Sequence, residues 1–181
     1  MIFPASVAPW AARLLIWLAV AGLPLAMLSA VYTAYLFAQA KARDLWQNPL
    51  LPPHLLVQSL LLGSSVLLPL AAWVEPAIIS PLLWILTITS LVHLLMIWGE
   101  VSLTHPTAHA RLAIWEMVHG RYRSDFWIGT ALSSAGGLLP AIVIYGSLPL
   151  SYGVSAAPLA LIGMMLFEHA YVQAGQSVPL A

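Results

Sequence analysis

Five long apolar runs restrict what this chain can fold into more than any other feature of its sequence. They cover residues 14–38, 55–74, 78–98, 126–146 and 152–172. A helix needs about 20 apolar residues to cross the hydrocarbon core of a bilayer. The runs are too long for strands, and an open strand would leave backbone groups unpaired in lipid. We therefore predict an all-α fold, a polytopic bundle of five transmembrane helices that makes residues 1–181 one integral membrane domain.

The scarcity of charge supports a lipid environment. Only 7% of the residues are charged and the mean hydropathy is +0.92, whereas a soluble domain has about 25% charged residues. The net charge of zero argues against a nucleic-acid partner, because phosphate binding requires a basic surface. The chain has no cysteine, which excludes iron–sulfur ligation by its own thiolates. The first run exceeds the about 7–15 apolar residues of a signal peptide, so we expect an uncleaved span.

Basic residues predict the orientation of the bundle. Five of the six lie in the two long connectors, 39–54 and 99–125, which fall on one side of a five-span topology. Only Arg13 lies on the other side. The positive-inside rule places the long connectors in the cytoplasm, and hence the N-terminus outside and the C-terminus inside.

Clusters of small residues interrupt two of the runs. Residues 63–65 read Gly-Ser-Ser, and residues 133–137 read Ser-Ser-Ala-Gly-Gly. Small side chains let membrane helices approach closely, so we predict helix contacts at both places.

The connector 99–125 carries half of the chain's ionisable residues. It includes His105, His109 and His119 around Glu116, which raises the question of a metal site. No HExxH pattern is present and Pro106 separates the first two histidines. We expect no metal here, and predict a helix lying at the membrane interface.

Ionisable residues inside or beside the spans are candidates for function, because their placement in lipid is costly. His93 and Glu100 are seven residues apart, and therefore share one face of a helix. Glu168 and His169 lie near the predicted cytoplasmic end of the last span. Together the four residues predict a proton path to the cytoplasm. The structural alternative is that the end residues extend to water and that a hydroxyl such as that of Thr89 satisfies His93.

Two other readings of these residues stay open. His93 and His169 lie at similar depth and could hold a b-type haem between two helices, as membrane anchors of respiratory enzymes do. The chain could also be a purely structural subunit. No GxSxG, Walker or dinucleotide-binding motif is present, so nothing indicates a self-contained enzyme.

Several motifs resemble the NrfD/PsrC family, the membrane subunits of polysulfide reductase and related enzymes. The first is the connector Ala42-Arg43-Asp44-Leu45-Trp46-Gln47-Asn48-Pro49-Leu50, preceded by Tyr32-Thr33-Ala34-Tyr35-Leu36. The second comprises Glu100, Thr104-His105-Pro106-Thr107 and His119-Gly120-Arg121-Tyr122. The ending Ala174-Gly175-Gln176-Ser177-Val178-Pro179-Leu180 also resembles that of the family.

The resemblance implies a subunit without its own cofactor. Such a subunit exchanges electrons between the quinone/quinol pool and an iron–sulfur subunit, within a multi-subunit complex of the bacterial inner membrane. Members usually have eight or more spans, so this chain resembles their five C-terminal helices. The family's quinone pocket is built mostly from earlier helices. We therefore transfer no quinone-binding residue, and expect any quinone to bind at an interface with other helices.

Overall fold

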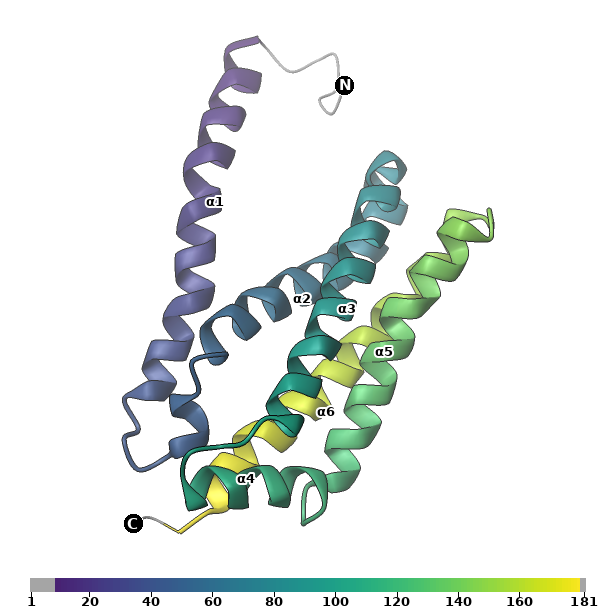
Figure 1. The fold of residues 1–181 in the computed structure, drawn as a ribbon. Coiled ribbons are helices and arrows are strands. Elements are labelled where there is room, and N and C mark those ends of the chain that lie inside the picture. Colours follow the sequence, from purple (N-terminus) through teal and green to yellow (C-terminus); the bar gives the residue numbers. More distant parts are fainter. Residues whose placement is uncertain (1–8, 180–181) are drawn as a thin grey trace.

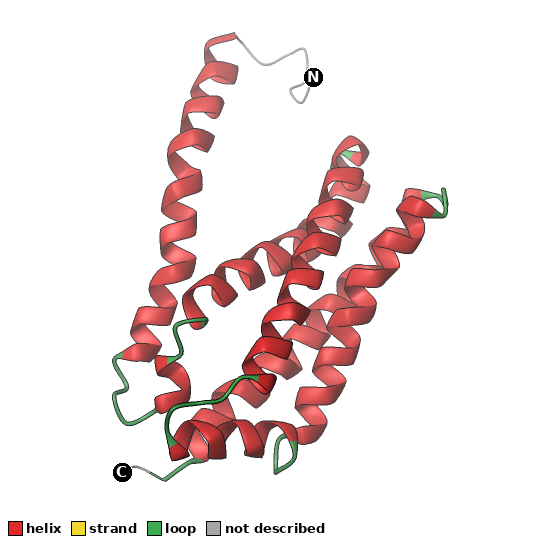
Figure 2. Cartoon of the chain, in the orientation of Figure 1, coloured by secondary structure: helices red, strands yellow, loops and turns green. Residues whose placement is uncertain are grey.

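The computed structural model describes residues 9–179, and within that range it contains helices and loops but no strand (Figures 1 and 2). The α-helices are α1 (Pro9–Ala38), α2 (Leu51–Val74), α3 (Ile79–Ser102), α4 (Ala108–Val118), α5 (Arg123–Tyr145) and α6 (Ala156–Ser177). Three short 3-10 helices join them: η1 (Asp44–Gln47), η2 (Pro76–Ile78) and η3 (Leu150–Ser155). The five α-helices other than α4 are long and apolar enough to cross a membrane, which confirms the predicted five-span all-α fold.

Four ends of three helices differ from the prediction in ways that matter for function. α2 begins at Leu51 and not at residue 55, because Pro52 and Pro53 fit a first helical turn that needs no backbone donors. α3 continues to Ser102 and so includes Glu100. α6 begins only at Ala156, after η3, but extends beyond the predicted end at 172 to Ser177.

Helices α2, α3, α5 and α6 form the packed bundle, and the contact between α5 and α6 is the most extensive. A Cβ atom on Gly163 would collide with the backbone nitrogen of Ser133 and would lie 2.8 Å from the carbonyl oxygen of Gly129. The predicted contact at residues 133–137 is therefore confirmed. The other predicted contact is confirmed only in part: Ser64 and Ser65 are buried, but Gly63 is exposed.

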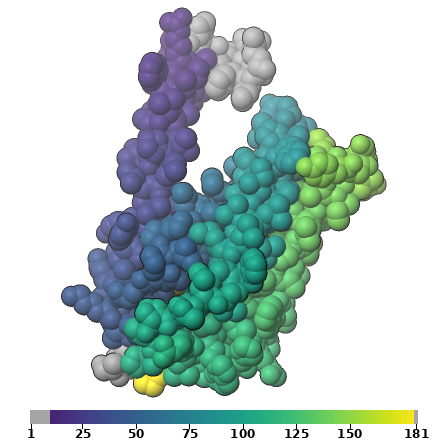
Figure 3. Space-filling view, viewed as in Figure 1, coloured from purple at the N-terminus to yellow at the C-terminus, as the bar shows by residue number. Residues whose placement is uncertain are grey.

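Helix α1 stands apart from this bundle. It packs mainly on α2 and η1, and its most apolar stretch has no buried residue. In Figure 3, α1 diverges from α2 and α3 so that open space separates their upper halves. The apolar side chains of α1 are consequently left to lipid or to other helices.

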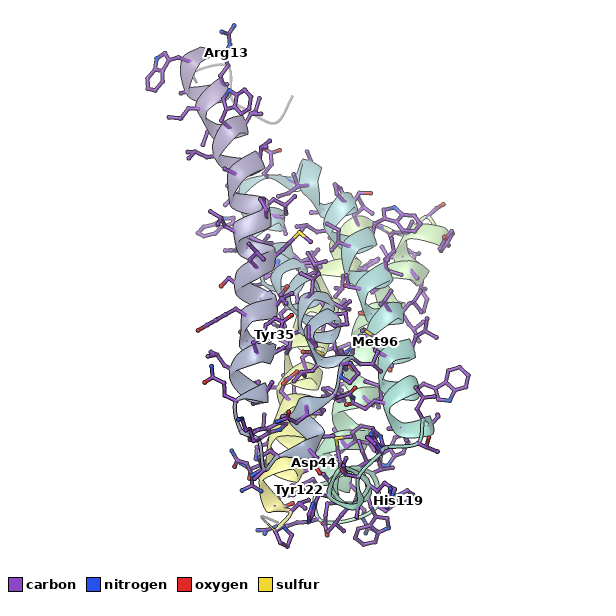
Figure 4. The ribbon with its side chains drawn as sticks, turned by 60° about the vertical axis from the view of Figure 1, so that its left-hand side comes forward. Arg13, Tyr35, Asp44, Met96, His119 and Tyr122 are labelled. Atoms are coloured by element: carbon purple, nitrogen blue, oxygen red, sulfur yellow. The ribbon has the colours of Figure 1, made fainter. Side chains whose placement is uncertain are left out.

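The charged segments gather at one end of the molecule. Figure 4 shows Asp44, His119 and Tyr122 at this end and Arg13 at the opposite end. Here α4 lies across the bundle and packs on α5, α6 and η1, so the predicted helix in the second connector is confirmed. We call this the charged end. Its location in the cytoplasm stays a prediction.

Candidate functional site

A buried polar cluster lies inside the bundle near the charged end. Its centre is His54 in the first turn of α2, together with His93 and Glu100 on α3. All three residues are at most 3% exposed. The 24-residue helix α3 places His93 and Glu100 on its inner face, two turns apart.

Short contacts connect these side chains across two helices and a loop. Nε2 of His54 lies 2.7 Å from Nδ1 of His93, and Nδ1 of His54 lies 3.8 Å from Oε2 of Glu100. The other carboxylate oxygen, Oε1, accepts a hydrogen bond of 2.9 Å from Nδ2 of Asn48, which follows η1. The four residues thus form a chain from Asn48 to His93, in which only the 3.8 Å step between His54 and Glu100 is longer than a hydrogen bond.

The ring of Phe167 packs against the histidine end of the cluster. The ring centroid of Phe167 lies 4.9 Å from that of His93 and 5.9 Å from that of His54. Nε2 of His93 has no hydrogen-bond partner among the residues that the structure describes. The cluster therefore ends in a buried imidazole nitrogen without a hydrogen-bond partner.

A second group of polar side chains adjoins His54 on the side of α6. A void of about 10 Å³, large enough for about one water molecule, is lined by His54, Gln58, Glu168 and Tyr171 together with apolar side chains. The Tyr171 hydroxyl donates a hydrogen bond of 3.3 Å to the carbonyl oxygen of Leu45. Glu168 and Gln58 lie beside each other on the far side of this void.

A cleft at the charged end reaches the cluster from outside the bundle. It has a volume of about 330 Å³ and is lined by Asn48, Glu100, Thr104 and His105, with Pro49, Leu50, Leu103 and Pro106. Nε2 of His105 lies 2.7 Å from the main-chain oxygen of Glu100, which positions this wall of the cleft. Glu100 is thus both part of the buried chain and part of the cleft wall.

The loops that build this cleft are the two connectors singled out in the sequence. A model of the NrfD family, described as polysulphide reductase, matches residues 1–179 and so covers both connectors and nearly all of the chain. The chain belongs to the NrfD family. No curated protein and no solved structure matches it. Family membership and the five apolar helices together establish an integral membrane subunit.

In this NrfD-family chain, three of the four predicted proton-path residues lie around His54: His93, Glu100 and Glu168. His169 lies elsewhere, since its side chain is exposed and its Nδ1 is 2.8 Å from Oδ2 of Asp125. Two of the four, His93 and Glu100, therefore belong to the buried cluster. The half-buried Glu168 adjoins the cluster at the void, and His169 belongs to a surface pair.

The alternative partner predicted for His93 is wrong. The Thr89 hydroxyl donates to the carbonyl oxygens of its own helix, at Ile85 and Leu86, while His93 contacts His54. This geometry does not fit a haem held between His93 and His169 either. One imidazole is packed between His54 and Phe167 and the other is tied to a surface carboxylate.

The histidines of the second connector are dispersed. His105 contacts the main chain of Glu100, His109 lies 3.7 Å from Asp44, and His119 ends α4. Within residues 9–179, no group of three or more His, Asp or Glu side chains is arranged to hold a metal ion.

Sequence reasoning missed His54, together with Asn48, Gln58 and Tyr171. Hydropathy places His54 in the polar connector 39–54, because the apolar run starts only at residue 55. The Pro52-Pro53 pair is the signal that could have corrected this. Two prolines at a helix start place the next residue, His54, in the first turn, where it can face the bundle.

Proposed function

We propose that this NrfD-family chain is the membrane subunit of an oxidoreductase complex in the bacterial inner membrane. In that complex it supports electron exchange between the quinone/quinol pool and an iron–sulfur partner subunit. The chain lacks cysteine, so the iron–sulfur carrier belongs to the partner. Oxidation of a quinol releases two protons and two electrons, and reduction of a quinone takes up both. Such a subunit therefore needs a route for protons as well as contact with the electron carrier.

The observation that supports this proposal is the buried chain from Asn48 through Glu100 and His54 to His93. Burial of three ionisable side chains in a membrane bundle is costly and is characteristic of proton relays. Glu100 has access to the cleft at the charged end. A proton can pass from this cleft to the carboxylate, and from there to the adjacent imidazole. With the charged end in the cytoplasm, this route exchanges protons with the cytoplasm.

The test is quinone-linked turnover of the complex carrying Glu100→Gln. Glutamine keeps the side-chain size and an oxygen that accepts from Asn48, but it cannot carry a proton. We expect the complex to assemble normally and its turnover to fall at least tenfold, about 1.4 kcal/mol in the activation barrier. His93→Ala is expected to lower turnover as well.

Glu75→Gln is the matched control. Glu75 is exposed and follows the last residue of α2, at the end of this helix that lies away from the buried cluster. Turnover of Glu100→Gln equal to that of Glu75→Gln would favour a purely structural subunit.

Mild-detergent purification is expected to recover an iron–sulfur protein with this chain. We expect no Soret absorption from the chain itself, and a Soret band would favour the haem alternative.

A further inference from the structure

A crevice between α1, α2 and α6 leads from the outside of the bundle to Glu168. It has a volume of about 210 Å³ and is open over much of its surface. Ala30 and Thr33 of α1 form one wall, and Glu168 of α6 lies at its inner end. The α2 wall consists of Leu55, Gln58, Ser59 and Leu62.

The position of the crevice along the helices places its mouth in lipid. Gln58 is seven residues from the start of α2, which corresponds to about 10 Å along the helix axis. Thr33 is five residues before the end of α1 at the same charged end. The crevice therefore lies farther from the charged end than the connecting loops do, at the level of the apolar helix surfaces.

The inner end of the crevice is polar, although its walls are largely apolar. Gln58 is 5% exposed and lines both the crevice and the water-sized void behind it. Its amide can donate a hydrogen bond to a ligand oxygen. The Glu168 carboxylate can accept one from a ligand hydroxyl, and the protonated carboxyl group can donate one to a ligand carbonyl. The same void is lined by His54, so the crevice adjoins the buried cluster.

We propose that this crevice binds the ring of a membrane-dissolved quinone or quinol, with one ring oxygen between Gln58 and Glu168 and the isoprenoid tail in lipid. This proposal rests on the quinone-linked function proposed above. Three properties favour such a ligand: an entrance from lipid, apolar walls for a flat ring, and a hydrogen-bonding pair at the inner end. The volume suits a ring headgroup and excludes the long tail, which remains outside.

The test is photolabelling of the intact complex in its native membrane with an azidoquinone, with the labelled peptides mapped afterwards. Ser59→Trp fills the mouth of the crevice from an exposed position and leaves Gln58 and Glu168 unchanged. The matched control is Leu60→Trp, since Leu60 is the next residue, is exposed and lies outside the crevice. We expect label within residues 30–33 or 55–62, and at least a fivefold loss of label in Ser59→Trp only.

Gln58→Leu provides a second test that keeps the crevice open. Loss of the amide donor is expected to raise the KM for quinol about tenfold while kcat changes less than twofold. Label on other helices that is unaffected by Ser59→Trp would overturn this binding site. If the labelling contradicts the site but the complex still turns over quinol, the proposed function stands and only the site is wrong. If the complex shows no quinone-linked turnover, both the proposed function and the site are wrong.

Discussion

Nε2 of His54 lies 2.7 Å from Nδ1 of His93, so that a hydrogen bond between two imidazoles joins α2 to α3 inside the bundle. One of the two nitrogens must donate and the other accept, which links the tautomers of the two rings. The second nitrogen of His54 faces Glu100 at 3.8 Å. His54 is therefore the side chain through which the carboxylate and the deepest imidazole influence each other.

The first prediction concerns the stability of this pair. His54→Leu leaves Nδ1 of His93 buried without a partner, which is expected to cost about 1–3 kcal/mol. The double variant His54→Leu/His93→Leu replaces both polar partners by apolar groups, and is expected to recover much of that loss. Thermal unfolding in detergent measures both, with exposed His119→Leu as the control. A double variant less stable than the single one would contradict the prediction.

The second prediction compares the same substitution at two glycines. Gly163→Ala introduces a Cβ atom against the backbone of α5, and is expected to destabilise the bundle by about 1–3 kcal/mol. Gly63→Ala meets no atom within 4 Å and is expected to be neutral or slightly stabilising, because alanine favours helix more than glycine does. The measurement is the midpoint of thermal unfolding of each variant in the same detergent, compared with that of the unsubstituted protein. Equal midpoints would show that the α5–α6 contact is not close.

The third prediction concerns the end of α6. Nη1 of Arg43 donates to the carbonyl oxygens of Gly175, Gln176 and Val178 at 3.2, 2.7 and 2.7 Å. The last carbonyls of a helix lack partners within it, and a cation there is favourable.

Loss of this guanidinium in Arg43→Gln is expected to destabilise the protein by about 1–2 kcal/mol. It should also speed proteolytic removal of the C-terminal residues. The control is Lys41→Gln, an exposed position in the same connector. Equal proteolysis rates in the two variants would show that Arg43 does not hold this terminus.

The fourth prediction concerns orientation. The chain has no cysteine, so Glu75→Cys and Arg121→Cys each introduce a single reactive thiol. The positive-inside rule predicts that a membrane-impermeant maleimide added to intact cells labels Glu75→Cys directly. It should label Arg121→Cys only after the membrane is opened. The reverse pattern would invert the topology, and with it the side from which protons enter.

The connectors show how far the sequence carried the prediction of the site. Charge density drew attention to residues 99–125, and these residues do form α4 and one wall of the cleft. The sequence also predicts that His93 and Glu100 share one face of a helix, because the helical repeat places residues seven apart on one face. His54 was overlooked because hydropathy marks where apolar residues begin, which is not where the helix begins.

Glu168 and His169 show most clearly what the sequence could not predict, because they are neighbours in sequence but have different surroundings in the structure. Adjacent helical residues point about 100° apart, so one lines the crevice and the void while the other reaches Asp125 at the surface. Only the packing partners of α6 reveal which of the two faces the cluster.

The sequence by itself determined that this chain is a five-span helical membrane protein. Its five apolar runs are long enough to cross a bilayer and carry little charge, and such segments span lipid as helices. Its connectors likewise identified the family. The tertiary structure decided which polar side chains meet, since the contacts of His54 with His93 and Glu100 join residues 39 and 46 positions apart in the chain. No local pattern encodes such distances, because they depend on how α2, α3 and α6 rotate and tilt against one another.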